Sequence, residues 1–136
     1  MYVFETQLRV RYADTDKMGF AYYGNYPKYY EVARVEAFRA LKYPYKEMED
    51  GGVGMPVLDL AVKYHRPAKY DDLLTVRVIV PEMPRARIKF LYEVTNEAGE
   101  LINTGETTLA FMQLATGRPV KMPERLKDAI APFFAD

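Results

Sequence analysis

Residues 25–42, which read NYPKYYEVARVEAFRALK, are the stretch that decides the fold. Nothing between Tyr26 and Lys42 breaks a helix, because the only proline falls in the first turn, where a missing N–H costs nothing. Asn25 is expected to cap the helix start, and the helix should end before Pro44. A helix of this length spans about 25 Å and could lie across several strands of a sheet.

The two sides of this helix differ in character. Apolar residues recur at spacings of three and four on one side: Tyr30, Ala33, Ala37, Ala40 and Leu41. The alanines form a stripe of small residues, which would let a flat surface such as a sheet approach closely. Charged residues three apart are expected to pair along the surface: Lys28, Glu31 and Arg34, and Glu36 with Arg39.

Strand patterns surround the helix. Apolar and polar residues alternate, or β-formers cluster, at residues 3–11, 57–65, 73–80, 85–95 and 101–114, and a short helix is expected at residues 123–134. This order predicts an α+β fold in which one long helix packs against an antiparallel sheet. A single helix leaves a face or an edge of such a sheet uncovered, so we expect the chain to form oligomers.

Composition limits the function further. The chain has 136 residues, enough for one domain, and its 19 basic and 19 acidic side chains cancel, which argues against nucleic acid as a partner. Cysteine is absent and His65 is the only histidine, so a cysteine nucleophile or a multi-histidine metal site within one chain is excluded. We expect no metal and no cofactor. No signal peptide or membrane span is recognisable, so a cytoplasmic location without a membrane partner is expected.

The loop before the helix, residues 12–26, reads YADTDKMGFAYYGNY and carries the candidate chemistry. Asp14 and Asp16 are followed by glycines that would let the backbone approach a ligand. The free N–H groups at a helix start can polarise an ester or thioester carbonyl, and a nearby carboxylate can attack that carbonyl or activate water. The same residues could instead form a structural turn in which the acids accept hydrogen bonds from backbone N–H groups.

This segment resembles the acyl-CoA thioesterases of the hotdog fold, specifically the 4-hydroxybenzoyl-CoA thioesterase family. The family pattern is Asp-x-Asp-x-x-Gly, a few apolar or aromatic residues, and an Asn-Tyr pair that opens the long helix. It is matched here by Asp14, Asp16, Gly19, Asn25 and Tyr26. The similarity continues through residues 64–74 and 116–120. The resemblance implies a single hotdog domain over residues 1–136, with an antiparallel sheet wrapped around a central helix.

The resemblance also implies roles for individual residues. Asp16 would be the catalytic nucleophile or general base, the N–H of Tyr23 would hold the carbonyl oxygen, and Asp14 would support them. Substrate contacts are expected from the loop at Gly19, Tyr22, Gly24 and Asn25. Gly24 departs from the family branches, which carry histidine or proline there. The family implies hydrolysis of an acyl-CoA by water, in active sites between the subunits of a homodimer or homotetramer.

Three cations on one strand are candidates for binding the phosphates of coenzyme A. Arg85, Arg87 and Lys89 are spaced by two and should share one face, with Ala86, Ile88 and Phe90 on the other. Arginine and lysine in a corresponding strand of related enzymes have that role. An ordinary solvated strand face is the alternative.

Several alternatives stay open. Related hotdog enzymes can use a glutamate of the helix as base, but a solvated charge is the favoured interpretation of Glu31 and Glu36. A structural role is favoured for His65. The tyrosines near the helix start could line an acyl pocket or a subunit contact. A non-catalytic acyl-CoA or acyl-carrier binding module is the second functional hypothesis, and hydration or dehydration of a thioester is the third.

Overall fold

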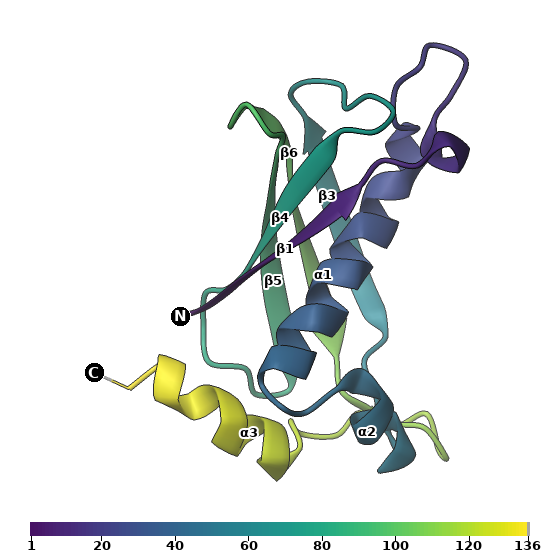
Figure 1. Cartoon of the computed structure of the whole chain (residues 1–136). Helices are drawn as coiled ribbons and strands as arrows, with labels where there is room; N and C mark the ends of the chain where they lie inside the picture. Colours follow the sequence, from purple (N-terminus) through teal and green to yellow (C-terminus); the bar gives the residue numbers. More distant parts are fainter. Residues whose placement is uncertain (136) are drawn as a thin grey trace.

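The computed structural model describes residues 1–135 and has the predicted α+β architecture (Figure 1). Five antiparallel strands form the sheet in the order β1-β4-β5-β6-β3. Their bounds are Tyr2–Arg9 (β1), Val57–Tyr64 (β3), Leu73–Val80 (β4), Arg87–Thr95 (β5) and Leu101–Ala110 (β6). The long helix α1, Tyr26–Ala40, packs against one face of this sheet, and β1 and β3 are its two edges.

Alternation along the strands produces the core between sheet and helix. In β5, for example, Ile88, Phe90, Tyr92 and Val94 are buried, whereas Arg87 and Lys89 are exposed. The buried residues of α1 are Tyr26, Tyr29, Tyr30, Ala33, Arg34, Ala37 and Phe38. The predicted alanine stripe is therefore wrong at Ala40, which is exposed. The row that begins with Ala33 and Ala37 continues at i+4 to Leu41, which packs partly against the core.

The closest approach of helix to sheet depends on an aromatic ring and a glycine. Tyr30 is fully buried, its ring stacks on Tyr92 with centroids 4.1 Å apart, and its hydroxyl donates to Oδ1 of Asn103 at 2.9 Å. A Cβ atom at Gly105 would lie only 2.6 Å from Cζ of Tyr30. Gly105 thus leaves the space into which the tyrosine ring fits, since no other residue type lacks a Cβ.

Smaller elements close one end of the sheet. Helix α2 (Tyr45–Asp50) and the two-stranded pair of β2 (Val53–Gly54) and β7 (Met112–Gln113) were not expected from the sequence. Helix α3 (Glu124–Ile130) is followed by a 3-10 turn at Ala131–Phe133. Both α2 and α3 lie at the end of the molecule opposite the loop that precedes α1 (Figure 1). Within residues 1–135, no helix is long and apolar enough to cross a membrane.

Four sequence-based boundaries are corrected by the structure. Helix α1 ends at Ala40 rather than at Lys42, which adopts a left-handed backbone with φ of 63° and so turns the chain away. The last long strand stops at Ala110, before the short β7, and α3 is shorter than expected. Strand β5 begins at Arg87, so Arg85 lies in the preceding loop, and Ala86 is exposed rather than turned to the core.

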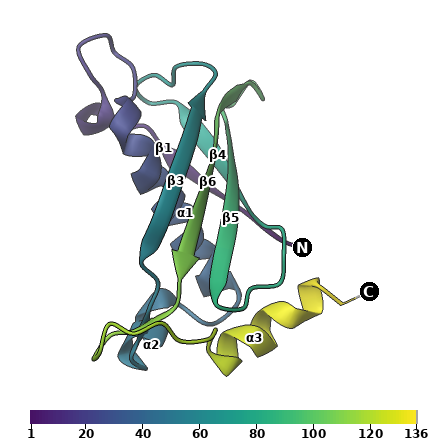
Figure 2. The same ribbon diagram turned by 180° about the vertical axis from the view of Figure 1, so that it is seen from behind.

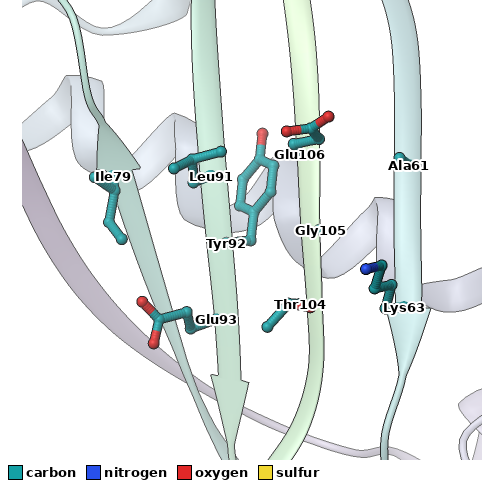
Figure 3. A pocket seen from close by; sticks show the side chains of 9 residues that line it. All are labelled: Ala61, Lys63, Ile79, Leu91, Tyr92, Glu93, Thr104, Gly105 and Glu106. Carbon is teal, nitrogen blue, oxygen red and sulfur yellow. The ribbon is translucent and has the colours of Figure 1, made fainter.

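The face of the sheet opposite α1 carries no helix (Figure 2). It has a hollow of about 450 Å³ whose floor is made of small residues, among them Ala61 and Gly105 (Figure 3). Charged residues surround the hollow, and two ion pairs run between neighbouring strands, Arg77 with Glu93 and Lys89 with Glu106, each at 3.4 Å. This outer face therefore carries charged residues around a hollow that also has the apolar side chains of Ile79 and Leu91 in its lining.

We predict that Gly105→Ala destabilises the protein by about 1–3 kcal/mol, because the added methyl group forces the Tyr30 ring out of a packed position. Urea denaturation followed by circular dichroism would measure the loss. Thr104→Ala, on the outer face of the same strand, is the matched control and should cost less than about 1 kcal/mol. Equal stability of Gly105→Ala and wild type would contradict the tight fit described here.

Candidate active site

A cavity of about 320 Å³ lies between the loop that precedes α1 and the chain that follows β3. It is lined by Asp16, Met18, Phe20, Ala21, Tyr23, Tyr26, Tyr64, His65, Arg66 and Pro67. The two predicted catalytic residues, Asp16 and Tyr23, therefore share one cavity. The fold adds residues more than 40 positions further along the chain, which the spacing within the loop did not reveal.

Asp16 is held by the backbone of its own loop. Its Oδ1 accepts hydrogen bonds from the N–H groups of Met18, at 2.9 Å, and Phe20, at 3.3 Å. A backbone bond from Asp16 N to Phe20 O closes the turn, and Gly19 supplies the positive φ of 80° that the turn needs. No described residue donates to the second carboxylate oxygen, Oδ2. Oδ1 therefore stabilises the turn, and Oδ2 has no hydrogen-bond donor among the described residues. The structural interpretation of Asp16 thus does not exclude the catalytic one.

Asp14, in contrast, is buried and fully engaged. Its carboxylate accepts hydrogen bonds from Lys28 Nζ at 2.7 Å, Tyr29 Oη at 3.0 Å and the Arg11 N–H at 3.1 Å. Burial by itself would raise the pKa of Asp14, but the hydrogen bonds from Lys28, Arg11 and Tyr29 outweigh it and lower the pKa below the usual 3.8. Asp14 fastens the loop to the first turns of α1, the supporting role that the resemblance implied.

The expected side-chain cap by Asn25 is not formed. A 3-10 turn, Tyr23–Asn25, leads directly into α1, so Asn25 already has a helical backbone and its side chain does not reach the first N–H groups. Its amide instead donates to the carbonyl of Asp14 at 2.7 Å, and the Tyr22 N–H donates to the same carbonyl at 2.8 Å. Asn25 therefore ties the loop together and is not an N-cap.

Tyr23 stands where the loop enters this 3-10 turn. Among residues 1–135, none accepts a hydrogen bond from its N–H, whereas its carbonyl accepts one from Tyr64 Oη at 2.9 Å. The ring of Tyr64 also packs edge-on against Tyr23 and Tyr26, with centroids 6.3 and 5.5 Å away. Tyr64, which sequence reasoning did not single out as a site residue, thus fixes the helix start against the end of β3.

Gly24 stands where the family branches carry histidine or proline, and the neighbouring Tyr22 ring is consistent with this difference. A Cβ atom there would lie 2.7 Å from Cε2 of Tyr22, whose ring packs against Tyr23 with centroids 4.6 Å apart. The ring of Tyr22 therefore occupies the space that a histidine or proline side chain would need. Tyr22 is about half exposed, so this ring is free to contact a ligand at the loop surface.

The structure does not bring the three predicted cations to Asp16 within one chain. Arg87 pairs with Ala110 of β6, whereas Tyr64, beside the cavity, pairs with Asn103, seven residues away. This separation is about 23 Å along the strands. Lys89 forms an ion pair with Glu106, and Arg85 lines a different cavity, near α3, with Lys121 and Lys127.

The remaining candidates are distributed as follows. His65 lines the Asp16 cavity, and its Nε2 lies 3.2 Å from Oγ1 of Thr104. Glu36 pairs with Arg39 at 3.3 Å, as predicted. The predicted pairing of Glu31 with Lys28 or Arg34 is wrong, because Lys28 is held by Asp14 and Arg34 turns inward to Tyr92 Oη at 3.0 Å.

Comparison with protein families matches residues 10–130 to the thioesterase-like superfamily. The chain belongs to this superfamily. It is 32% identical to an acyl-CoA thioesterase, YbgC, of Haemophilus influenzae, over 93% of each chain. It is 29% identical to the putative acyl-CoA thioesterase YneP of Bacillus subtilis, over 94% of this chain and 93% of that protein.

A solved structure agrees with this assignment. The DHNA-CoA thioesterase of Staphylococcus aureus superposes with a TM-score of 0.93 at 35% identity, over 98% of this chain and 92% of that one. The predicted hotdog fold and the predicted thioester hydrolase activity are therefore confirmed. The alternative of a non-catalytic binding module is not favoured.

Asp14→Asn should lower the free energy of unfolding by about 1–3 kcal/mol at neutral pH, because it weakens three hydrogen bonds to a buried, charged acceptor. Since the folded-state pKa of Asp14 is lowered, its stabilisation is present above the unfolded value near 3.8 and disappears as the pH falls through the folded value. The difference between variant and wild type should therefore shrink in acid.

Urea titrations at pH 7 and about pH 3 would measure this change. Asp50→Asn is the matched control, because Asp50 forms only an exposed i,i+4 pair with Lys46 and should contribute less than about 0.5 kcal/mol at either pH. A constant difference between Asp14→Asn and wild type across this pH range would contradict an ionised, buried Asp14.

Proposed function

We propose that this acyl-CoA thioesterase uses Asp16 as its catalytic carboxylate and the Tyr23 N–H as the donor that binds the thioester oxygen. One observation carries this proposal. The cavity that holds both residues presents a carboxylate oriented by two backbone N–H groups, with its second oxygen free among the described residues. A backbone N–H at the start of α1 adds the positive end of the helix dipole.

The chemistry follows two possible routes from the same geometry. In one, Asp16 attacks the thioester carbon, the C–S bond breaks, coenzyme A leaves as the thiolate, and water hydrolyses the mixed anhydride. In the other, Asp16 takes a proton from water, which attacks the carbon directly. Both routes place negative charge on the carbonyl oxygen, where the Tyr23 N–H would stabilise it. Water is the only second substrate, so neither route needs a cofactor.

A second subunit would complete the site through the free edge of β3. This edge strand exposes four large apolar side chains beside the charged Asp59 and Lys63: Val57, Leu58, Leu60 and Tyr64, each between 43 and 51% exposed. An unprotected edge of this kind pairs readily with another strand, and antiparallel pairing with the same strand of a second copy gives a twofold homodimer. The other edge, β1, carries Glu5, Gln7 and Arg9 instead.

The same dimer would bring the three cations toward the active site. Twofold antiparallel pairing of β3 places the Val57 end of one subunit next to the Tyr64 end of its partner. Arg87 lies at the Val57 end, so the Arg85, Arg87 and Lys89 of one subunit would approach the Asp16 cavity of the other. We therefore propose that they bind coenzyme A phosphates across the dimer. A homotetramer and a cytoplasmic location stay predictions.

Asp16→Asn should lower kcat for acyl-CoA hydrolysis at least about 100-fold, because an amide is neither a nucleophile nor a base. Its geometry can still accept the Met18 and Phe20 hydrogen bonds, so fold and oligomeric state should be unchanged. Release of free thiol, measured over a panel of acyl-CoA esters, is the assay. Asp128→Asn, an exposed acid on α3, should behave like wild type. Hydrolysis by Asp16→Asn at the wild-type rate would refute the assignment.

Leu58→Asp should weaken self-association at least about tenfold, because dimer formation would then bury an unpaired carboxylate. Sedimentation velocity would measure the monomer–dimer equilibrium, and hydrolysis should fall together with the dimer fraction. Gln7→Asp introduces the same charge at the opposite edge and should leave association unchanged. A fully active monomer would contradict a site completed by the partner.

A further inference from the structure

A buried arginine on α1 has no acidic partner. Arg34 is only 6% exposed, donates one hydrogen bond to Tyr92 Oη at 3.0 Å, and lies 6.0 Å from the ring centre of Phe90. Its Nε is buried without an acceptor, and no ion pair among residues 1–135 includes it. An arginine remains charged at any physiological pH, and a buried charge is costly unless it is paired. The buried hydroxyl of Tyr45 lies beside the guanidinium as well. Both phenols are neutral, so Arg34 has polar neighbours within the described residues but no counter-ion.

The guanidinium lines a cavity that could receive a counter-ion. This cavity of about 270 Å³ lies between α1 and the edge strand β3 and is lined by Pro27, Lys28, Glu31, Arg34, Val57, Leu60 and Thr107. Pro27, Val57 and Leu60 give the cavity apolar walls, and Arg34 is its buried charge, whereas Lys28 and Glu31 are exposed. Thr107 adds a hydroxyl that lies 2.6 Å from Tyr92 Oη. An apolar cavity with one buried cation suits a ligand that is apolar along its length and acidic at its end.

The Arg34 cavity and the Asp16 cavity lie along the same seam between α1 and β3, although they share no lining residue. Tyr26 and Tyr64 line the first cavity, and Pro27 and Leu60 line the second. Arg34 lies about 12 Å from Tyr26 along the helix, and its side chain points back toward the helix start, as helical side chains do. An acyl group whose carbonyl rests at Tyr23 and which follows this seam would therefore end at the guanidinium.

The dimer proposed above also brings an Asp16 cavity and an Arg34 cavity close together. Antiparallel pairing of β3 places the partner's copy of the Arg34 cavity, at its Val57 end, beside the Tyr64 end of this chain. In either arrangement the far end of an acyl group meets an Arg34 guanidinium. Glu31, at the mouth of the cavity, is exposed and does not form an ion pair with Arg34.

We propose that Arg34 is a specificity-determining residue that binds an acidic oxygen, carboxylate or phenolic, at the far end of the acyl group. This proposal rests on the thioesterase function proposed above. An acyl group that provides this oxygen pairs the buried cation, whereas an apolar group of the same size leaves the charge unpaired and is disfavoured. Arg34 itself takes no part in breaking the C–S bond.

The experiment compares two matched pairs of thioesters on the full-length protein. Adipoyl-CoA and hexanoyl-CoA differ in a terminal carboxylate, and 4-hydroxybenzoyl-CoA and benzoyl-CoA differ in a phenol. For wild type we expect kcat/KM to favour the acidic member of at least one pair by about tenfold or more, as for one charge-assisted hydrogen bond. The pair that shows this preference identifies the source of the oxygen.

Arg34→Met keeps the length of the side chain and removes the charge. We expect it to reduce the preference to less than about twofold while hydrolysis of the apolar member is maintained. Arg34→Lys should keep part of the preference, and Glu31→Gln, in the same cavity, should keep all of it. The proposal is overturned if wild type shows no preference in either pair, or if Arg34→Met retains the wild-type preference.

Two further measurements keep the test decisive. If Arg34→Met does not fold, inhibition of wild type by the primary amides of the four acyl groups replaces it, because a neutral amide then stands where the free acid would carry a carboxylate. Equal inhibition within both pairs refutes the role of Arg34. Non-hydrolysable thioether analogues of the four esters, bound to Asp16→Asn, separate this inference from the catalytic proposal. A binding preference there supports Arg34 whether or not Asp16 is the catalytic acid, and equal binding within both pairs counts against Arg34 alone.

Discussion

The carboxylate of Asp14, buried between the loop and the first turns of α1, is the interaction on which the rest of the site depends. It accepts hydrogen bonds from the helix through Lys28 and Tyr29 and from the loop through the Arg11 N–H. Its backbone carbonyl accepts two more, from Tyr22 and Asn25. These bonds fix the path of the loop, and therefore the positions of the acid and of the N–H that point into the cavity.

Two kinds of polar side chain recur in the molecule: those whose hydrogen bonds are all made within the chain, and those that keep a polar atom free. Asp14 and Asp16 are two residues apart, yet one is buried and saturated with donors, whereas the other keeps an oxygen free beside a cavity. On the helix, Tyr30 is satisfied by Asn103 and packed over Gly105, whereas Arg34, one turn further along, lacks a counter-ion. Saturated groups give the fold its rigidity, and the unsaturated ones mark where ligand or partner is expected.

In a single chain, strand β3 forms an unpaired edge of the sheet beside the candidate active site. The β3 edge exposes large apolar side chains, and residues of this strand line both cavities: Tyr64 the one that holds Asp16, and Val57 and Leu60 the one that holds Arg34. The cations that would suit coenzyme A lie at the far end of the same sheet. The twofold pairing at β3 proposed above would account for all three features together, because antiparallel pairing places opposite ends of the two strands side by side.

The sequence by itself determined what depends on local spacing. The period of residues 26–40 indicates a helix with an apolar side, strand alternation assigns the inward residues of β5, and the loop pattern places Asp16 and Tyr23 near each other. These features could be predicted because neighbours along the chain remain neighbours in a turn, a helix or a strand. The misplaced Ala40 and the absent Asn25 cap lie at helix ends, where tertiary contacts replace local rules.

Only the tertiary structure decided which residues from distant segments meet. It placed Tyr64 and His65 at the Asp16 cavity and turned Arg34 inward to Tyr92. It also set Arg87 about 23 Å along the strands from Tyr64, which lines that cavity. The physical reason is that strand order and register fix these distances. Both depend on the packing of the whole sheet against α1 and not on the identity of any short segment.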